Sequence, residues 1–114
     1  MLLNCRYVSV AVNCPYSGPV PPQATANVAQ ELLRMGCFEV SIGDTTGAAT
    51  APAIQAVFHE CSRHNRIETL AGHFHDTYGQ ALPNVVAALR MGVRLSTLPV
   101  NVVDCGQQML WVRL

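Results

Sequence analysis

Short apolar segments alternate with helical patterns along most of this 114-residue chain. The apolar segments cover residues 7–12, 38–42 and 69–73. Their centres lie about 30 residues apart, which is the length of a strand, helix and strand in a parallel sheet. They are largely apolar throughout, as is typical of strands that are buried on both faces. The alternation therefore predicts an α/β fold in which helices cover a parallel sheet.

Helical signals lie between and after these expected strands. Thr50 is placed to cap the second helix, while Gly36 and Gly92 follow the first and third, where glycine often ends a helix. The expected helices span residues 23–35, 50–64 and 80–91, and residues 93–95 would open a fourth strand. The chain should therefore form about three and a half β/α units.

Polar residues collect where the expected strands end. Parallel strands joined by right-handed crossovers place all their carboxyl ends on one side of the sheet. Active sites of barrels and open α/β sheets form at that edge. We expect any chemistry of this chain at the same edge, which carries Asn13, Asp44, His73, His75 and Asp76.

Composition argues against several other functions. The formal net charge is zero and the seven basic residues are scattered arginines, so we expect no nucleic-acid partner. No apolar run approaches the roughly 20 residues of a membrane span, and no signal peptide precedes the first strand. The five cysteines lack a Cys-x-x-Cys pair, which favours free thiols and a cytoplasmic location. Among them, Cys14 is either a nucleophile or, as we expect, a small buried apolar residue.

Two residues suggest a metal-dependent reaction. His73 and His75 are separated by one residue, so on a strand their imidazoles lie on the same face and can converge on a divalent metal. The alternative is a pair of hydrogen-bonded histidines at a strand end. Asp44 is either a turn or helix-cap aspartate or a carboxylate that handles a proton near the metal. Imidazole suits zinc or manganese, whereas carboxylate and amide oxygens suit magnesium or manganese.

Several stretches together resemble the hydroxymethylglutaryl-CoA lyase family, which belongs to a metal-dependent superfamily of lyases and Claisen-condensing enzymes built on the TIM barrel. The matching stretches are Tyr7–Ser9, Cys14–Gly18, Met35–Thr45, His73–Leu82 and Ala88–Val93. In condensing relatives the His-x-His is typically followed by Asn-Asp. Here Asp76, Thr77 and Tyr78 follow, which favours the lyase.

The resemblance implies a partial (β/α)8 TIM barrel and a retro-Claisen cleavage of hydroxymethylglutaryl-CoA to acetyl-CoA and acetoacetate. His73 and His75 would help to hold Mg2+ or Mn2+. Asp44 would act in catalysis, and Tyr7 and Thr45 would lie near the acyl-CoA substrate.

The family pattern also includes features that this chain lacks. Nothing here matches the Arg-Asp pair of the family's first strand or its glycine-rich loop with a catalytic cysteine. We therefore expect residues 1–94 to form a partial lyase-type barrel and residues 95–114 a divergent tail. In a shifted reading frame, residues 95–99 can encode the family's Val-Asp-Ser-Ser, which suggests a frameshift.

These departures lead us to expect little or no lyase activity from such a fragment. Its open sheet edges would permit self-association. Two alternatives stay open: a condensing synthase or aldolase of the same superfamily, and a non-catalytic remnant or association module.

Overall fold

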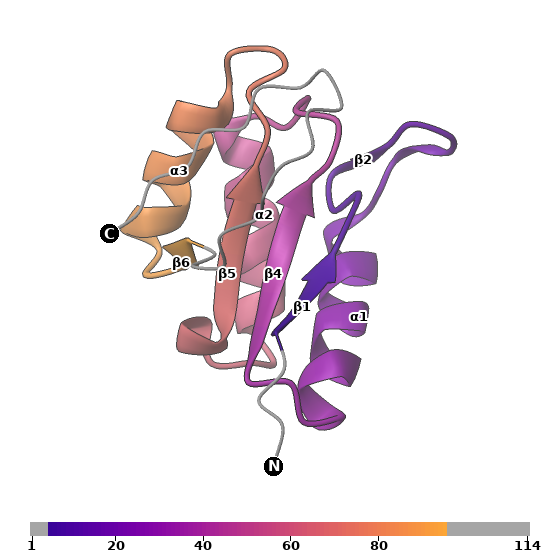
Figure 1. The fold of residues 1–114 in the computed structure, drawn as a ribbon, viewed down its shortest axis with the longest axis vertical. Helices are drawn as coiled ribbons and strands as arrows, with labels where there is room; N and C mark the ends of the chain where they lie inside the picture. The colour runs from indigo at the N-terminus through magenta and orange to yellow at the C-terminus, as the bar shows by residue number, and fades with distance from the viewer. Residues whose placement is uncertain (1–4, 96–114) are drawn as a thin grey trace.

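The computed structural model of the chain describes residues 5–95. Within this range the strands of the main sheet alternate with helices as the sequence predicts, and a short hairpin follows the first strand (Figure 1). The elements are β1 Cys5–Val8, β2 Asn13–Cys14, β3 Gly18–Pro19, α1 Pro22–Arg34, β4 Glu39–Asp44, α2 Ala51–Ser62, the 3-10 helix η1 Ile67–Thr69, β5 Leu70–Phe74, α3 Ala81–Arg90 and β6 Arg94–Leu95.

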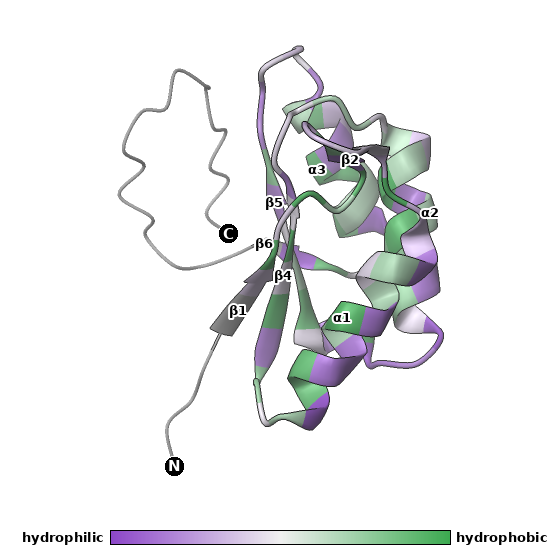
Figure 2. Cartoon of the chain, turned by 90° about the vertical axis from the view of Figure 1, so that its right-hand side faces the viewer, coloured by the Kyte–Doolittle hydropathy of each residue, from purple (hydrophilic) through white to green (hydrophobic). Residues whose placement is uncertain are grey.

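Four of the strands form one parallel sheet in the order β1-β4-β5-β6. The short strands β2 and β3 pair separately as an antiparallel hairpin. Helices α1, α2 and α3 all lie on the same side of the sheet (Figure 2). The prediction of parallel β/α units is therefore confirmed.

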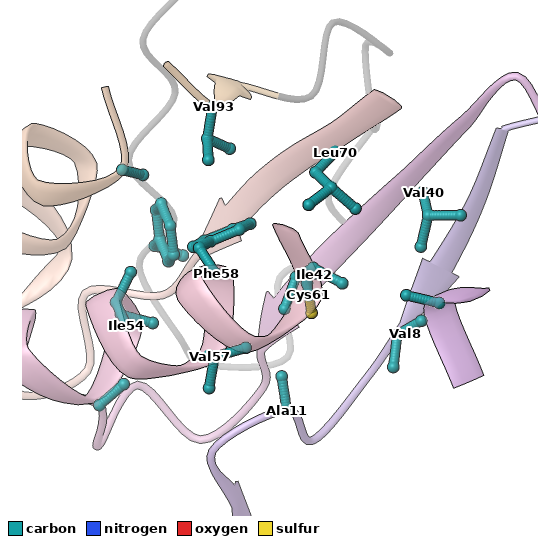
Figure 3. Close-up of a cluster of buried hydrophobic side chains, with 14 of the residues drawn as sticks. Val8, Ala11, Val40, Ile42, Ile54, Val57, Phe58, Cys61, Leu70 and Val93 are labelled. Carbon is teal, nitrogen blue, oxygen red and sulfur yellow. The ribbon is translucent and has the colours of Figure 1, made fainter. Parts of the chain in front are cut away.

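Alternate residues of the strands point to opposite faces of the sheet. We call the side that packs against the helices the helix-covered face; its side chains include Val8, Val40, Ile42, Leu70 and Phe74. Figure 3 shows several of these side chains directed at Val57, Phe58 and Cys61 of α2. This face holds the hydrophobic core of the described residues.

We call the opposite side the histidine face. The strand register places Tyr7 beside Ser41, Ser41 beside Ala71, and Gly43 beside His73. These five residues therefore share one face, and three of them have small side chains or none. The sheet thus has an apolar face and a face that carries a phenol, a hydroxyl and an imidazole.

The first strand is shorter than the sequence suggests. It ends at Val8 rather than at Val12, because the backbone turns at Val10, which has a φ of 51°. The Val10 N–H donates to Thr45 Oγ1 at 2.9 Å, and the Ala11 N–H donates to the Gly43 carbonyl at 3.1 Å. These contacts hold the chain after β1 against the end of β4.

Other boundaries differ by a few residues. Thr50 occupies the N-cap position of α2, but its side chain makes no capping hydrogen bond, so that prediction holds only for its position. Strand β4 continues through Asp44, and β5 through Phe74. Residues 5–95 contain no helix that is long and apolar enough to cross a membrane. Apart from Leu95, the tail expected at 95–114 lies outside the described residues.

Candidate functional site

All five predicted site residues lie at or near the carboxyl edge of the parallel sheet. Asp44 is the last residue of β4, and Thr45 follows it. His73 is in β5, His75 comes directly after this strand, and Tyr7 is in β1. The parallel arrangement thus brings together side chains that are far apart in the sequence.

The two histidines lie close to each other. Their ring centroids are 5.3 Å apart, with an angle of 55° between the ring planes. The His73 ring also meets the Tyr7 ring edge to face at 5.8 Å. Because Tyr7 and His73 are on strands that flank β4, this contact passes over the small residues Ser41 and Gly43.

The surroundings of His73 favour neutral imidazole, the form that binds metals. Burial lowers the pKa of His73 to about 4, and the positive charge of His75 contributes in the same direction. The His75 side chain is buried, and among the described residues its Nδ1 atom has no hydrogen-bond partner. An unpaired buried nitrogen is costly unless a ligand satisfies it. The pair therefore fits two ligand positions of a divalent cation.

These two positions do not complete a metal site. Within residues 5–95, no group of three or more His, Cys, Asp or Glu side chains is placed to hold a metal ion. His59, Cys61 and His64 lie close in sequence, but Cys61 is buried in the core while His59 and His64 are exposed. A third ligand of these four residue types is therefore not found within residues 5–95.

Asp44 has the strand position of the helix-covered face, opposite to the histidine face. The register pairs it with Phe74, and its side chain is only 1% exposed. Its Oδ2 atom accepts a hydrogen bond from the Ala49 N–H at 3.2 Å, and its carbonyl accepts one from the Gly47 N–H at 3.3 Å. Asp44 therefore anchors the turn that leads into α2, as the turn interpretation predicted.

This anchoring engages only one of the two carboxylate oxygens of Asp44. Among the described residues Oδ1 has no hydrogen-bond partner. Burial raises the pKa of Asp44, while the Ala49 N–H, the His75 charge and the Gly47 N–H act against this rise. Asp44 can thus hold a proton at higher pH than an exposed aspartate, and the catalytic interpretation stays a prediction beside the structural one.

Tyr7 and Thr45, the predicted substrate-binding residues, both have structural contacts. Tyr7 is 39% exposed and packs against His73, as described above. The Thr45 hydroxyl accepts the Val10 N–H, but a hydroxyl can still donate its own proton to another group. Both positions are compatible with substrate contact, and the assignment stays a prediction.

Cys14 does not meet our expectation of burial. It lies in the β2–β3 hairpin and is partly exposed, because the hairpin projects from the sheet rather than covering it. A hydrogen bond from the Ser17 side chain, with help from backbone groups, lowers the pKa of its thiol.

Sequence reasoning did not single out the two polar residues that are 0% exposed, Ser41 and Asn84. Ser41 is 0% exposed on the histidine face. Asn84 is also 0% exposed, and its Nδ2 donates to the Ala49 carbonyl at 2.9 Å. A signal for Asn84 was available, because it falls within the apolar periodicity of α3 beside Ala81 and Val85.

The sequence of this chain is similar to those of known proteins. A family model described as HMGL-like matches residues 3–103. The hydroxymethylglutaryl-CoA lyase of Pseudomonas mevalonii is 50% identical over 88 residues, which make up 77% of this chain and 29% of that protein. A 3-hydroxy-3-isohexenylglutaryl-CoA/hydroxy-methylglutaryl-CoA lyase of Pseudomonas aeruginosa is 54% identical over 91 residues, with 76% of this chain and 29% of that protein covered.

The fold agrees with these matches. The crystal structure of the HMG-CoA lyase from Brucella melitensis is similar with a TM-score of 0.81 and 45% identity, over 82% of this chain and 33% of that one. The chain thus spans less than a third of the length of the curated relatives named above. Together with the parallel sheet, the likeness confirms the prediction of a partial barrel.

Proposed function

Since the chain belongs to the HMGL-like family, we propose that it is part of a carbon–carbon lyase that cleaves hydroxymethylglutaryl-CoA to acetyl-CoA and acetoacetate. The names of its relatives support this substrate class. The observation that carries the proposal is the pair of adjacent imidazoles at the carboxyl edge of the sheet, with Asp44 at the end of the neighbouring strand.

The reaction requires one proton transfer before the carbon–carbon bond breaks and one after it. The C3 hydroxyl of the substrate first loses its proton. The C2–C3 bond then breaks, its electron pair stays with C2 as the acetyl-CoA enolate, and C2 is protonated. We assign Asp44 to handle a proton or to orient a ligand at this edge, because its Oδ2 is fixed while its Oδ1 lacks a partner among the described residues.

Lyases of this family depend on a divalent metal. We propose that His73 and His75 supply two ligands for Mg2+ or Mn2+. The chemistry that such an ion supplies is polarisation of the substrate oxygens and stabilisation of developing negative charge. Tyr7 and Thr45 would contact the acyl-CoA substrate from β1 and from the loop after β4, respectively.

Metal titration tests the site directly. We expect Mn2+, followed by electron paramagnetic resonance, to bind the 114-residue chain, and His73→Ala or His75→Ala to weaken this binding at least about tenfold. His59→Ala and His64→Ala are matched controls, because both of these histidines are exposed and lie away from the edge. Equal binding by all four variants would contradict the proposed site.

Product analysis tests the reaction. For the 114-residue chain alone we expect little or no acetoacetate release from hydroxymethylglutaryl-CoA with Mg2+ or Mn2+, since its described residues offer only an incomplete metal site. Reading the gene beyond both ends gives the decisive experiment. If those flanks encode the Arg-Asp strand and the cysteine loop, the extended protein should release acetoacetate. An extended protein that instead condenses acetyl-CoA with a 2-oxo acid would overturn the lyase assignment.

Self-association through the sheet edges is also part of this proposal. Strands β1 and β6 lie at the two ends of the described sheet, and each pairs with one neighbour there. Open edges favour pairing with another chain. Sedimentation velocity should therefore show mass that increases with protein concentration, and a constant monomer mass would contradict this expectation.

The remaining parts of the proposal concern location and boundaries. Cys14, Cys37 and Cys61 are free thiols, which supports the expected cytoplasmic location. The division between a partial barrel at residues 1–94 and a tail at 95–114 also stays a prediction. Sequencing the gene in all frames would test the frameshift, and the absence of a lyase-like peptide in another frame would exclude it.

A further inference from the structure

A buried chain of hydrogen bonds connects α3 with the carboxylate at the end of β4. Asn84 lies on the core side of α3 and is 0% exposed. Burying a side-chain amide is unfavourable unless hydrogen bonds replace those it makes with water. Its presence among Ala81, Val85 and Ala88 therefore requires an explanation from its contacts.

The hydrogen bond of its side chain goes to the loop between β4 and α2, while its Oδ1 has no partner among the described residues. Asn84 Nδ2 donates to the Ala49 carbonyl at 2.9 Å. On its other side, the Ala49 N–H donates to Asp44 Oδ2 at 3.2 Å. Ala49 is itself only 1% exposed, so water does not compete for either bond. Asn84 is thus linked to Asp44 through a single buried residue, although it lies 35 positions beyond Ala49 in the sequence.

Other contacts fix the rest of this loop. The Gly47 N–H bonds to the Asp44 carbonyl, which closes the turn after β4. Gly47 also lies against Thr77, so close that a Cβ atom at position 47 would stand 2.7 Å from Thr77 Oγ1. Neither contact involves Ala49. The bond from Asn84 acts on Ala49 itself and restrains the residue that holds the carboxylate.

We propose that Asn84 is a positioning residue that orients the Asp44 carboxylate through Ala49. It keeps Oδ2 engaged by the Ala49 N–H and so directs Oδ1, which lacks a partner among the described residues, toward the task assigned to Asp44. The functional part of this inference rests on the proposed role of Asp44. The hydrogen-bond relay does not, because it can be measured without metal or substrate.

Nuclear magnetic resonance of the full 114-residue chain tests the relay. The scalar coupling across the hydrogen bond between the Ala49 nitrogen and the Asp44 Cγ carbon reports directly on the orientation of the carboxylate. In Asn84→Leu, which keeps the size of the side chain but removes the donor, we expect this coupling to disappear. Exchange of the Ala49 amide proton should become roughly tenfold faster, as expected when about one hydrogen bond is lost.

Val85→Ala provides the matched control, because Val85 is the buried neighbour of Asn84 on α3. This change should lower the global stability while the folded molecules keep the Ala49–Asp44 coupling. Asn27→Leu, at an exposed asparagine of α1, controls for the substitution itself. If Asn84→Leu does not fold, Asn84→Ala removes the same donor without filling the space.

Loss of the coupling in the Asn84 variants alone would support the positioning role. An unchanged coupling in a folded Asn84 variant would overturn it, because Asn84 would then only stabilise the fold. A chain that keeps the Ala49–Asp44 coupling but does not bind Mn2+ would contradict the proposed metal site. It would not contradict the positioning role of Asn84. The two proposals can therefore fail separately.

Discussion

The two faces of the parallel sheet are made by the same strands but differ in chemistry. On the helix-covered face, Val40, Ile42 and Leu70 belong to the hydrophobic core and are at most 1% exposed. On the histidine face, the neighbouring positions are occupied by Ser41 and Ala71, with His73 at the end that carries the proposed site. One face closes the core and the other presents polar groups.

This difference shows how short strands can serve two purposes. Because successive side chains point to opposite sides, every second residue can be selected for packing and the others for chemistry. Truncations on the helix-covered face should therefore cost the most stability and truncations on the histidine face less, while metal binding should depend on the two histidines themselves. Paired substitutions at adjacent positions separate the two effects.

The largest expected difference is between Ile42→Ala and Ser41→Ala. Ile42 is 1% exposed in the core, so its truncation should leave a cavity and lower the free energy of unfolding by about 2–5 kcal/mol. Ser41 is just as buried, but within residues 5–95 its Oγ atom has no hydrogen-bond partner. Removing this hydroxyl should change stability by less than about 1 kcal/mol. Urea unfolding followed by circular dichroism measures both.

Equal losses in the two variants would contradict this prediction, because the histidine face would then contribute to stability as the core does. Mn2+ binding should separate Ser41 from the histidines on the same face. Ser41→Ala keeps both histidines and should bind the ion as the unmodified chain does.

A smaller difference is expected where the loops after β4 and β5 meet. Gly47 and Gly79 have φ angles of +72° and +70°, so alanine at either position costs about 1–2 kcal/mol of backbone strain. A Cβ atom at Gly47 would also lie 2.7 Å from Thr77 Oγ1, whereas at Gly79 nothing lies within 4 Å. Gly47→Ala should therefore lose about 1–3 kcal/mol more, as overpacking typically costs. Identical urea midpoints for the two variants would show that the loops are not tightly packed together.

The parallel sheet could be predicted from the sequence because its signals are local. Apolar strands and helical periodicity, with glycine after the helices, placed α1 and α3 within one residue of their observed ends. The His-x-His spacing likewise places two rings on one face without any knowledge of the rest of the fold. These features depend on residues that are close in the chain.

The features that the sequence did not predict depend on distant contacts. Strand β1 ends early because Val10 takes a left-handed conformation, which valine disfavours, and contacts at the end of β4 hold it there. Asn84 interrupts an apolar pattern visibly, but its partner Ala49 lies 35 residues away and cannot be identified without the fold. The anchoring of Asp44 by Ala49 depends in the same way on the path of a loop.

The smallest expected effect is the pH dependence that His73 contributes. Burial, together with the charge of His75, lowers its pKa from 6.5 to about 4 in the folded chain. Between these values the unfolded chain binds a proton that the folded chain does not, so stability falls as the pH decreases from 6.5 to about 4 and stops changing below that. Because the side chain is only partly buried, solvent screening should reduce the loss to about 1 kcal/mol.

Asp44 acts in the opposite direction, because a raised carboxyl pKa favours the folded state as the pH decreases. The contribution of His73 must therefore be isolated by difference. We compare metal-free His73→Asn with the unmodified chain by urea unfolding at several pH values. Both contain Asp44, so its contribution cancels in the difference. As the pH falls below 6.5, the unmodified chain should lose stability relative to His73→Asn. A stability difference that stays constant with pH would mean that the imidazole on the histidine face is well solvated. In that case the two faces would differ in composition but not in how far each excludes water.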